Sequence, residues 1–124
     1  MSADQIAEIS PLIREVFDHA RERPAQDEIL CATFEIVGVD NAWAQVTPTE
    51  LNVAYPSIRS PEDELREIIR GLPAAKLVAW EPNKFATWSF VSDRPGEVAE
   101  VVDLILAKLF DPGDYSVDGQ LEQM

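Results

Sequence analysis

The sequence predicts an α+β fold in which helices pack on a single antiparallel sheet of five strands. Segments with helical spacing of apolar residues and segments with alternating apolar and polar residues follow one another in the order α-β-β-β-α-β-β-α. Short links between consecutive strands favour antiparallel neighbours. The chain has 124 residues, of which 46% are hydrophobic, enough for one core. We expect one domain over residues 1–110 and an acidic tail over residues 111–124.

The first predicted helix begins near the N-terminus and runs to about Ala20. Ser2 and Gln5 have the spacing of a capping box, and apolar residues then recur every three or four positions. Pro11 leaves two alternatives open, because a proline inside a helix removes one backbone hydrogen bond. Either the helix continues through Pro11, or Ser10 caps a shorter helix whose first residue is Pro11.

Three short strands are expected next, as an antiparallel meander. Residues 29–37 alternate between apolar and mixed positions, as in a strand with one buried face. Turn-forming residues at 38–41 separate this strand from a second over residues 42–47. Pro48 then interrupts the chain before a third alternating segment over residues 51–55.

A second helix has the clearest start signal in the chain. Ser60 occupies the expected cap position, and Pro61 the first helical position. Gly71 and Pro73 end the helix. Its apolar stripe serves either the core of the chain or an interface between two copies. The residues of this candidate dimer interface are Leu65, Ile68, Ile69 and Leu72.

The last part of the chain is expected to add a hairpin, a helix and the tail. The hairpin strands cover residues 76–80 and 85–91, and Trp80 and Trp88 face each other across them in the core. The final helix opens at residues 93–96 and ends at residues 111–113. The residues after it contain no Lys or Arg and are predicted to be a mobile tail.

The charge balance excludes several classes of partner. Ten Lys and Arg residues against 23 Asp and Glu residues leave a net charge of −13. Such a field repels phosphate backbones and anionic lipid headgroups, so we expect neither nucleic acid nor membrane as a partner. The N-terminal segment lacks the basic and apolar regions of a secretory signal, which predicts a cytoplasmic protein.

The sequence contains no recognisable set of catalytic or metal-binding residues. Cys31 is the single cysteine and His19 the single histidine, so neither a disulfide nor a Cys/His metal cluster is indicated. The glycines are scattered, which disfavours a phosphate-binding loop. We therefore expect no catalytic, metal-ligating or cofactor-binding residue, and no cofactor.

Trp43 is the main candidate for contact with a partner. In the second strand, Ala42, Ala44 and Val46 alternate with more polar positions. If the small residues lie under a helix, Trp43 stands on the polar face as an exposed anchor; in the opposite register it belongs to the core. The candidate partner-binding residues are Trp43, Gln45 and Thr47.

The order of elements in a small, strongly acidic domain resembles the type III secretion chaperone-like fold, which also includes the YbjN-like bacterial proteins. The segments that carry most of this resemblance are residues 29–36 and 77–90. The resemblance implies binding of protein segments through apolar patches of the sheet and the first helix, commonly as a homodimer. It also implies that residues 60–72 form the interfacial helix.

We therefore expect a non-enzymatic protein-binding module: a small chaperone or regulatory adaptor, acting as a homodimer on a client or regulated protein. Its acidity would steer it toward basic segments of that partner. An alternative is an acidic inhibitor, of the immunity-protein type, that neutralises a basic toxin or nuclease. A third hypothesis is a domain that binds a small molecule in a pocket of the sheet.

Overall fold

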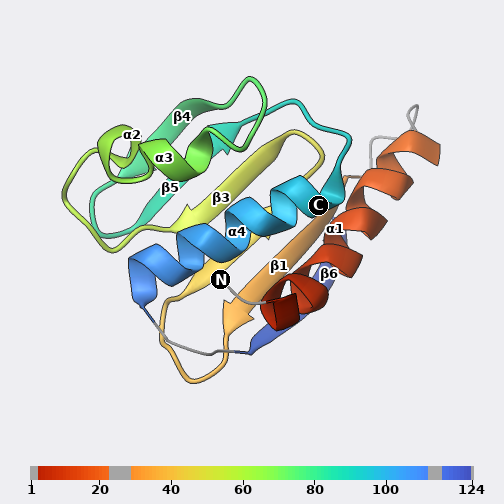
Figure 1. Cartoon of the computed structure of the whole chain (residues 1–124), viewed down its shortest axis with the longest axis horizontal. Helices are drawn as coiled ribbons and strands as arrows, with labels where there is room; N and C mark the ends of the chain where they lie inside the picture. The colour runs from red at the N-terminus through yellow and green to blue at the C-terminus, as the bar shows by residue number, and fades with distance from the viewer. Residues whose placement is uncertain (1–2, 23–28, 112–115, 124) are drawn as a thin grey trace.

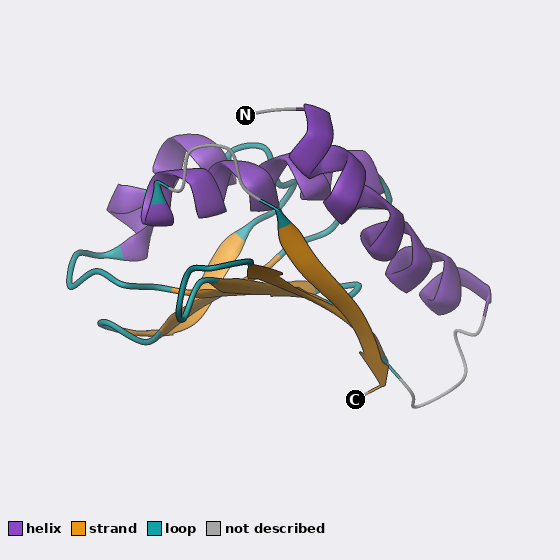
Figure 2. Cartoon of the chain, turned by 90° about the horizontal axis from the view of Figure 1, so that it is seen from below, coloured by secondary structure: helices purple, strands orange, loops and turns teal. Residues whose placement is uncertain are grey.

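Helices pack on one side of a six-stranded sheet in the computed structural model, which describes residues 3–22, 29–111 and 116–123 (Figure 1). Seen along the sheet, every described helix lies on the same side of the strands (Figure 2). The helices are α1 (Ala3–Glu22), α2 (Pro61–Glu64), α3 (Arg66–Ile69) and α4 (Pro95–Phe110). The strands are β1 (Leu30–Ile36), β2 (Trp43–Val46), β3 (Glu50–Ala54), β4 (Lys76–Glu81), β5 (Phe85–Ser89) and β6 (Val117–Gln123).

The sheet is open and antiparallel throughout, with the strand order β4-β5-β3-β2-β1-β6. The predicted meander β1-β2-β3 and the predicted hairpin β4-β5 are both present. The hairpin joins the meander through β5, which pairs with β3. The α+β class with one antiparallel sheet is therefore confirmed, but the sheet has six strands rather than five.

The sixth strand comes from the segment that we expected to be a mobile tail. β6 pairs with β1 over seven residues of each strand. A carboxylate oxygen of Glu8 in α1 accepts the backbone N–H of Val117 at 2.8 Å, which anchors the start of β6. The prediction failed because the acidic residues hid an alternation in which Val117, Gly119 and Leu121 face the helices. Residues 112–115 of the expected tail lie outside the described part of the chain.

The helix expected over residues 60–72 is interrupted. Leu65 has a φ of −112° and a ψ of 12°, which divides the segment into α2 and α3. Ser60 is the N-cap residue, as predicted, but its side chain makes no cap hydrogen bond. Leu65, at the break, is fully buried in the core, and Leu72, beyond the end of α3, is buried as well.

α1 is continuous through Pro11, which decides between the two alternatives for this helix. Pro11 lies on the exposed side, where water can satisfy the carbonyl group that lacks a helical partner. The opposite side of α1 buries Ile9, Ile13 and Val16 completely. Burial of that face outweighs the cost of one missing hydrogen bond.

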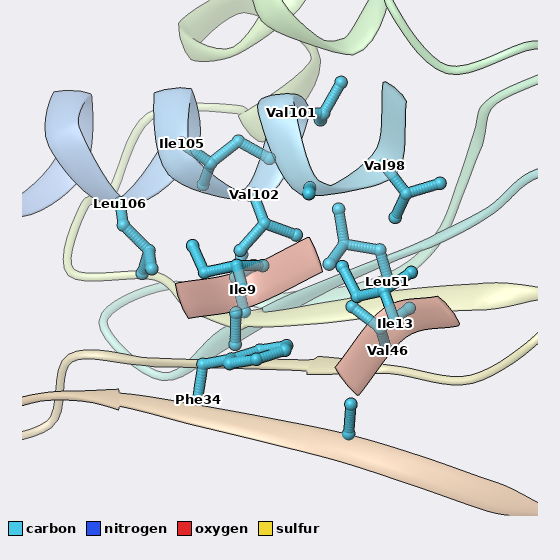
Figure 3. Packing of buried hydrophobic residues seen from close by; sticks show 14 of the residues in the cluster. Ile9, Ile13, Phe34, Val46, Leu51, Val98, Val101, Val102, Ile105 and Leu106 are labelled. Carbon is cyan, nitrogen blue, oxygen red and sulfur yellow. The ribbon is translucent and has the colours of Figure 1, made fainter. Parts of the chain in front are cut away.

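The core lies between α1, α4 and the sheet. Val98, Val102 and Leu106 of α4 point toward Phe34, Val46 and Leu51 of the strands, with Ile9 and Ile13 of α1 beside them (Figure 3). α4 begins at Pro95 and ends before Asp111, whose left-handed φ of 43° terminates it, within the predicted boundaries.

The hairpin differs from its predicted register. Trp88 lies opposite Leu77, and Trp80 lies opposite Ala86, because the turn at residues 82–84 pairs Glu81 with Phe85. The two tryptophans therefore do not face each other. Both still point to the helix side, where Trp88 is buried and Trp80 packs edge-on against Tyr55 with a centroid distance of 6.0 Å.

Candidate functional site

The strands present a second face that no described helix covers (Figure 2). Alternation assigns every second strand residue to this side, which we call the helix-free face. Open antiparallel sheets commonly have one packed and one solvated face. The residues of the four inner strands on the helix-free face are Cys31, Thr33, Glu35, Trp43, Gln45, Glu50, Asn52, Ala54, Phe85, Thr87 and Ser89.

The structure decides the register of β2. Ala42, Ala44 and Val46 are buried beneath the helices, which is the first of the two predicted arrangements. Trp43 and Gln45 are half-buried on the helix-free face, and Thr47 is half-buried directly after the end of β2. The three candidate partner-binding residues therefore lie together on one side of the sheet. Their role in binding stays a prediction.

Trp43 belongs to an aromatic row that crosses three strands. Ala44 of β2 pairs with Val53 of β3, so the residues one position further along, Trp43 and Ala54, lie opposite each other. Ala54 pairs on its other side with Phe85 of β5. Ala54 is only 4% exposed, although no helix covers it. Two half-buried aromatic side chains on either side of a small residue account for this burial. We call these three residues the aromatic row.

A hollow of about 640 Å³ lies at the end of the aromatic row. Trp43 and Ala54 contribute to its lining, together with residues of the β1–β2 and β4–β5 turns and with Tyr55, Pro56 and Phe110, so the hollow opens at the ends of the strands. Its charged groups are Asp40 and Lys84, and Lys84 also pairs with Glu81 at 3.3 Å. The hollow offers room for a side chain next to an aromatic wall, with one charge of each sign at its rim.

A chain of hydrogen bonds runs along the neighbouring row of the helix-free face. The Thr87 hydroxyl donates to Asn52 Oδ1 at 2.9 Å, and Asn52 Nδ2 donates to Gln45 Oε1 at 3.4 Å. The bonds join β5, β3 and β2, and they restrict the rotamers of the polar side chains beside Trp43. A surface of fixed polar groups binds with a smaller entropy cost than a mobile one.

The helix-free face is acidic at its margins. Its charged strand residues include only one cation, Lys76 at the start of β4. The carboxylates are Glu35, Glu50, Glu81, Asp118 and Glu122, all exposed. The aromatic row therefore lies within a field that favours a positively charged partner.

Cys31 also alternates onto this side but is only 3% exposed. Burial is the main cause that raises the pKa of its thiol, and the nearby Glu122 carboxylate adds to the rise. The thiolate is therefore scarce at neutral pH, which disfavours a nucleophilic role. Among the side chains that the structure describes, no group of three or more His, Cys, Asp or Glu is arranged to hold a metal ion.

The four residues of the candidate dimer interface divide into two pairs. Leu65 and Leu72 are buried in the core of their own chain, so they are not available to a second copy. Ile68 and Ile69 of α3 are half-buried and pack against the same core. An interface on this helix would therefore use the exposed parts of these two isoleucines.

Four residues that lie beside Trp43 and Gln45 were not among the predicted partner-binding residues: Asn52, Ala54, Phe85 and Thr87. The alternation within residues 50–54 and 85–89 was a signal for their direction. Their proximity to Trp43 depends on the pairing of β3 with β5, which joins segments more than 30 residues apart along the chain.

Comparisons with known proteins add nothing to this geometry: no family model, curated protein or solved structure matches the chain. Across the described ranges, no helix is long and apolar enough to cross a membrane.

Proposed function

We propose that this protein is a non-enzymatic binding module, a small chaperone or regulatory adaptor, and that it holds a basic, extended segment of a partner protein on its helix-free face. The observation that carries the proposal is the aromatic row of Trp43, Ala54 and Phe85 on an uncovered sheet surface with acidic margins. Trp43 acts as the anchor residue, and the hollow beside it receives an apolar side chain of the partner.

The division of roles follows from general properties of interfaces. Tryptophan is enriched among the few residues that supply most of the free energy of binding. The carboxylates around the row increase the association rate with a cationic segment and reject acidic ones. The same acidity also favours the alternative of an inhibitor that covers the substrate site of a basic toxin or nuclease, and that alternative would use the same face.

The test uses synthetic peptides of about 12 residues as probes, each in an unfolded form. One alternates Lys with Leu, a second alternates Glu with Leu, and a third alternates Lys with Ser. We expect calorimetry at low salt to detect binding of the Lys/Leu peptide, with affinity that falls as salt rises. Binding of the Glu/Leu peptide at equal affinity would contradict the proposal.

The matched variants are Trp43→Ser and Ile58→Ser. Ile58 is 75% exposed in the loop before α2, so its substitution removes apolar surface outside the aromatic row. We expect Trp43→Ser to weaken peptide binding by roughly 30-fold, the size of a hot-spot substitution, and Ile58→Ser to change it less than about two-fold. Equal effects of the two substitutions would remove Trp43 as the anchor.

We further propose that the protein is a homodimer through the exposed parts of Ile68 and Ile69 in α3. Sedimentation equilibrium at tens of micromolar tests the oligomeric state. A monomer at all concentrations contradicts the dimer, but it leaves the proposal for the helix-free face intact because the two surfaces are on opposite sides of the sheet.

A further inference from the structure

A second hollow lies on the helix side of the sheet, where α3 passes the edge hairpin. Its volume is about 540 Å³. The apolar part of the lining includes Leu72, Leu77 and Trp88, and the charged part includes Arg66, Arg70 and Lys76. Among the described residues, Glu62 is the single carboxylate in the lining. An apolar floor with a cationic rim is the arrangement of a site for an amphipathic anion.

The hollow exists because the short helices do not cover the outer strand. α2 and α3 have only four residues each, and the break at Leu65 turns the chain between them. β4 is the outermost strand at this end of the sheet, and Leu77 remains half-buried where the neighbouring Trp88 is only 2% exposed. The floor is therefore formed by side chains that the core already holds in place.

The charge of the rim is opposite to that of the whole chain. Three of the ten Lys and Arg residues line this one hollow, in a protein of net charge −13. Arg66 pairs with Asp63 at 2.8 Å and Arg70 with Glu67 at 3.3 Å. Both pairs are exposed, and such pairs contribute little to stability, so the guanidinium groups are free to exchange partners.

We propose that this hollow binds a small monocarboxylate with an apolar body. The carboxylate lies between Arg66 and Arg70, and the body lies on Leu77 and Trp88. Guanidinium groups match the planar geometry of a carboxylate through paired hydrogen bonds, which favours this anion. The volume suits a ligand of small to moderate size. The inference does not rest on the proposed peptide site, which occupies the other face of the sheet. Ile69 lines this hollow, so the ligand and the proposed dimer compete for the surface of α3.

The probes are octanoate, 1-octanol and octylammonium, each below its aggregation concentration, added to the full chain. They share the apolar body and differ in charge. We expect octanoate to bind saturably with one site per chain and at least roughly ten-fold more tightly than the other two, as a charge-assisted contact would produce. No saturable octanoate binding up to about 10 mM, or equal binding of 1-octanol, overturns the inference.

Arg70→Gln and Arg94→Gln form a matched pair of variants. Each arginine is exposed and forms an ion pair with a glutamate three residues away at 3.3 Å, but only Arg70 lines the hollow. We expect Arg70→Gln to weaken octanoate binding roughly ten-fold and Arg94→Gln to change it less than about two-fold. Equal losses would mean that only the overall charge matters, which overturns the site.

The three tryptophan indole N–H signals in a nitrogen-15 NMR spectrum locate the ligand. Trp88 lies at the floor of this hollow, whereas Trp43 lies on the helix-free face. We expect octanoate to shift the Trp88 signal and leave the Trp43 signal unchanged. A shift of Trp43 with Trp88 unchanged would place octanoate at the other hollow and overturn the inference.

Discussion

The two faces of the sheet differ completely in what they contribute, although their residues alternate along the same strands. On the helix-covered face, Phe34, Val46 and Leu51 have no exposed surface. One position away, Thr33 and Gln45 are half-buried and polar. The comparison teaches that most of the stability comes from one face, which leaves many side chains of the other available for recognition.

Phe34→Ala is expected to have the largest effect on this comparison. Phe34 lies beneath the helices in the cluster shown in Figure 3, so truncation removes buried area and leaves a cavity. We expect the free energy of unfolding, measured by urea denaturation, to fall by about 3–5 kcal/mol. Thr33→Ala is the control on the helix-free face and should cost under about 1 kcal/mol. Similar losses would show that the two faces share the stabilisation.

Gly119→Val in β6 is expected to have the next largest effect. A Cβ atom at Gly119 would displace the end of the Leu12 side chain of α1 and come into van der Waals contact with the Phe34 ring, and the two further methyl groups of valine need additional space there. We expect a loss of about 1–3 kcal/mol and faster hydrogen exchange of the β6 amides. Gln120→Val, on the helix-free face of the same strand, should change stability by less than about 0.5 kcal/mol. Unchanged exchange in Gly119→Val would contradict the packing of α1 on β6.

Asn52→Ala tests how much the hydrogen bonds of the helix-free face contribute to stability. It removes the acceptor of the Thr87 hydroxyl and the donor to Gln45. We expect a loss of about 1 kcal/mol in urea denaturation, because these side chains are partly exposed and water replaces part of each bond. Ser89→Ala on the same face of β5 is the control, and a larger loss there would show that the hydrogen-bonded chain has no special role.

The smallest expected effect is a change in how stability depends on pH in alkaline solution. Burial raises the pKa of Tyr55, whose hydroxyl donates to the carbonyl of Arg59 at 2.5 Å. A folded-state pKa above the unfolded value contributes stability that is complete below about pH 10 and is lost as the pH rises through the folded pKa. Tyr55→Phe should therefore lose less stability between pH 8 and pH 11 than the parent chain does.

The control for this prediction is the background Cys31→Ser, because burial raises the pKa of the Cys31 thiol in the same direction. Measuring Tyr55→Phe in that background separates the two contributions to the pH dependence of stability. Equal slopes with and without the Tyr55 hydroxyl would contradict its raised pKa.

Much of the fold could be predicted from local patterns. The alternation in residues 29–55 predicted the meander, and Pro95 marked the start of α4 correctly. The sequence allowed Trp43 to lie either on the polar face of β2 or in the core. Only the packing of Ala42, Ala44 and Val46 beneath the helices decided between these two arrangements. The neighbours of Trp43 could not be predicted, because the pairing of β3 with β5 is a long-range contact without a local signal.

The sequence by itself determined the α+β class, the position of most helices and strands, and the strong negative charge, because these depend on residues close together in the chain or on composition alone. Tertiary structure alone decided that α1 continues through Pro11, that Leu65 interrupts the second helix, and that residues 117–123 form β6. For α1, burial of an apolar face against the sheet outweighs the local cost of Pro11, and for β6, pairing with the distant β1 outweighs the low strand preference of an acidic segment.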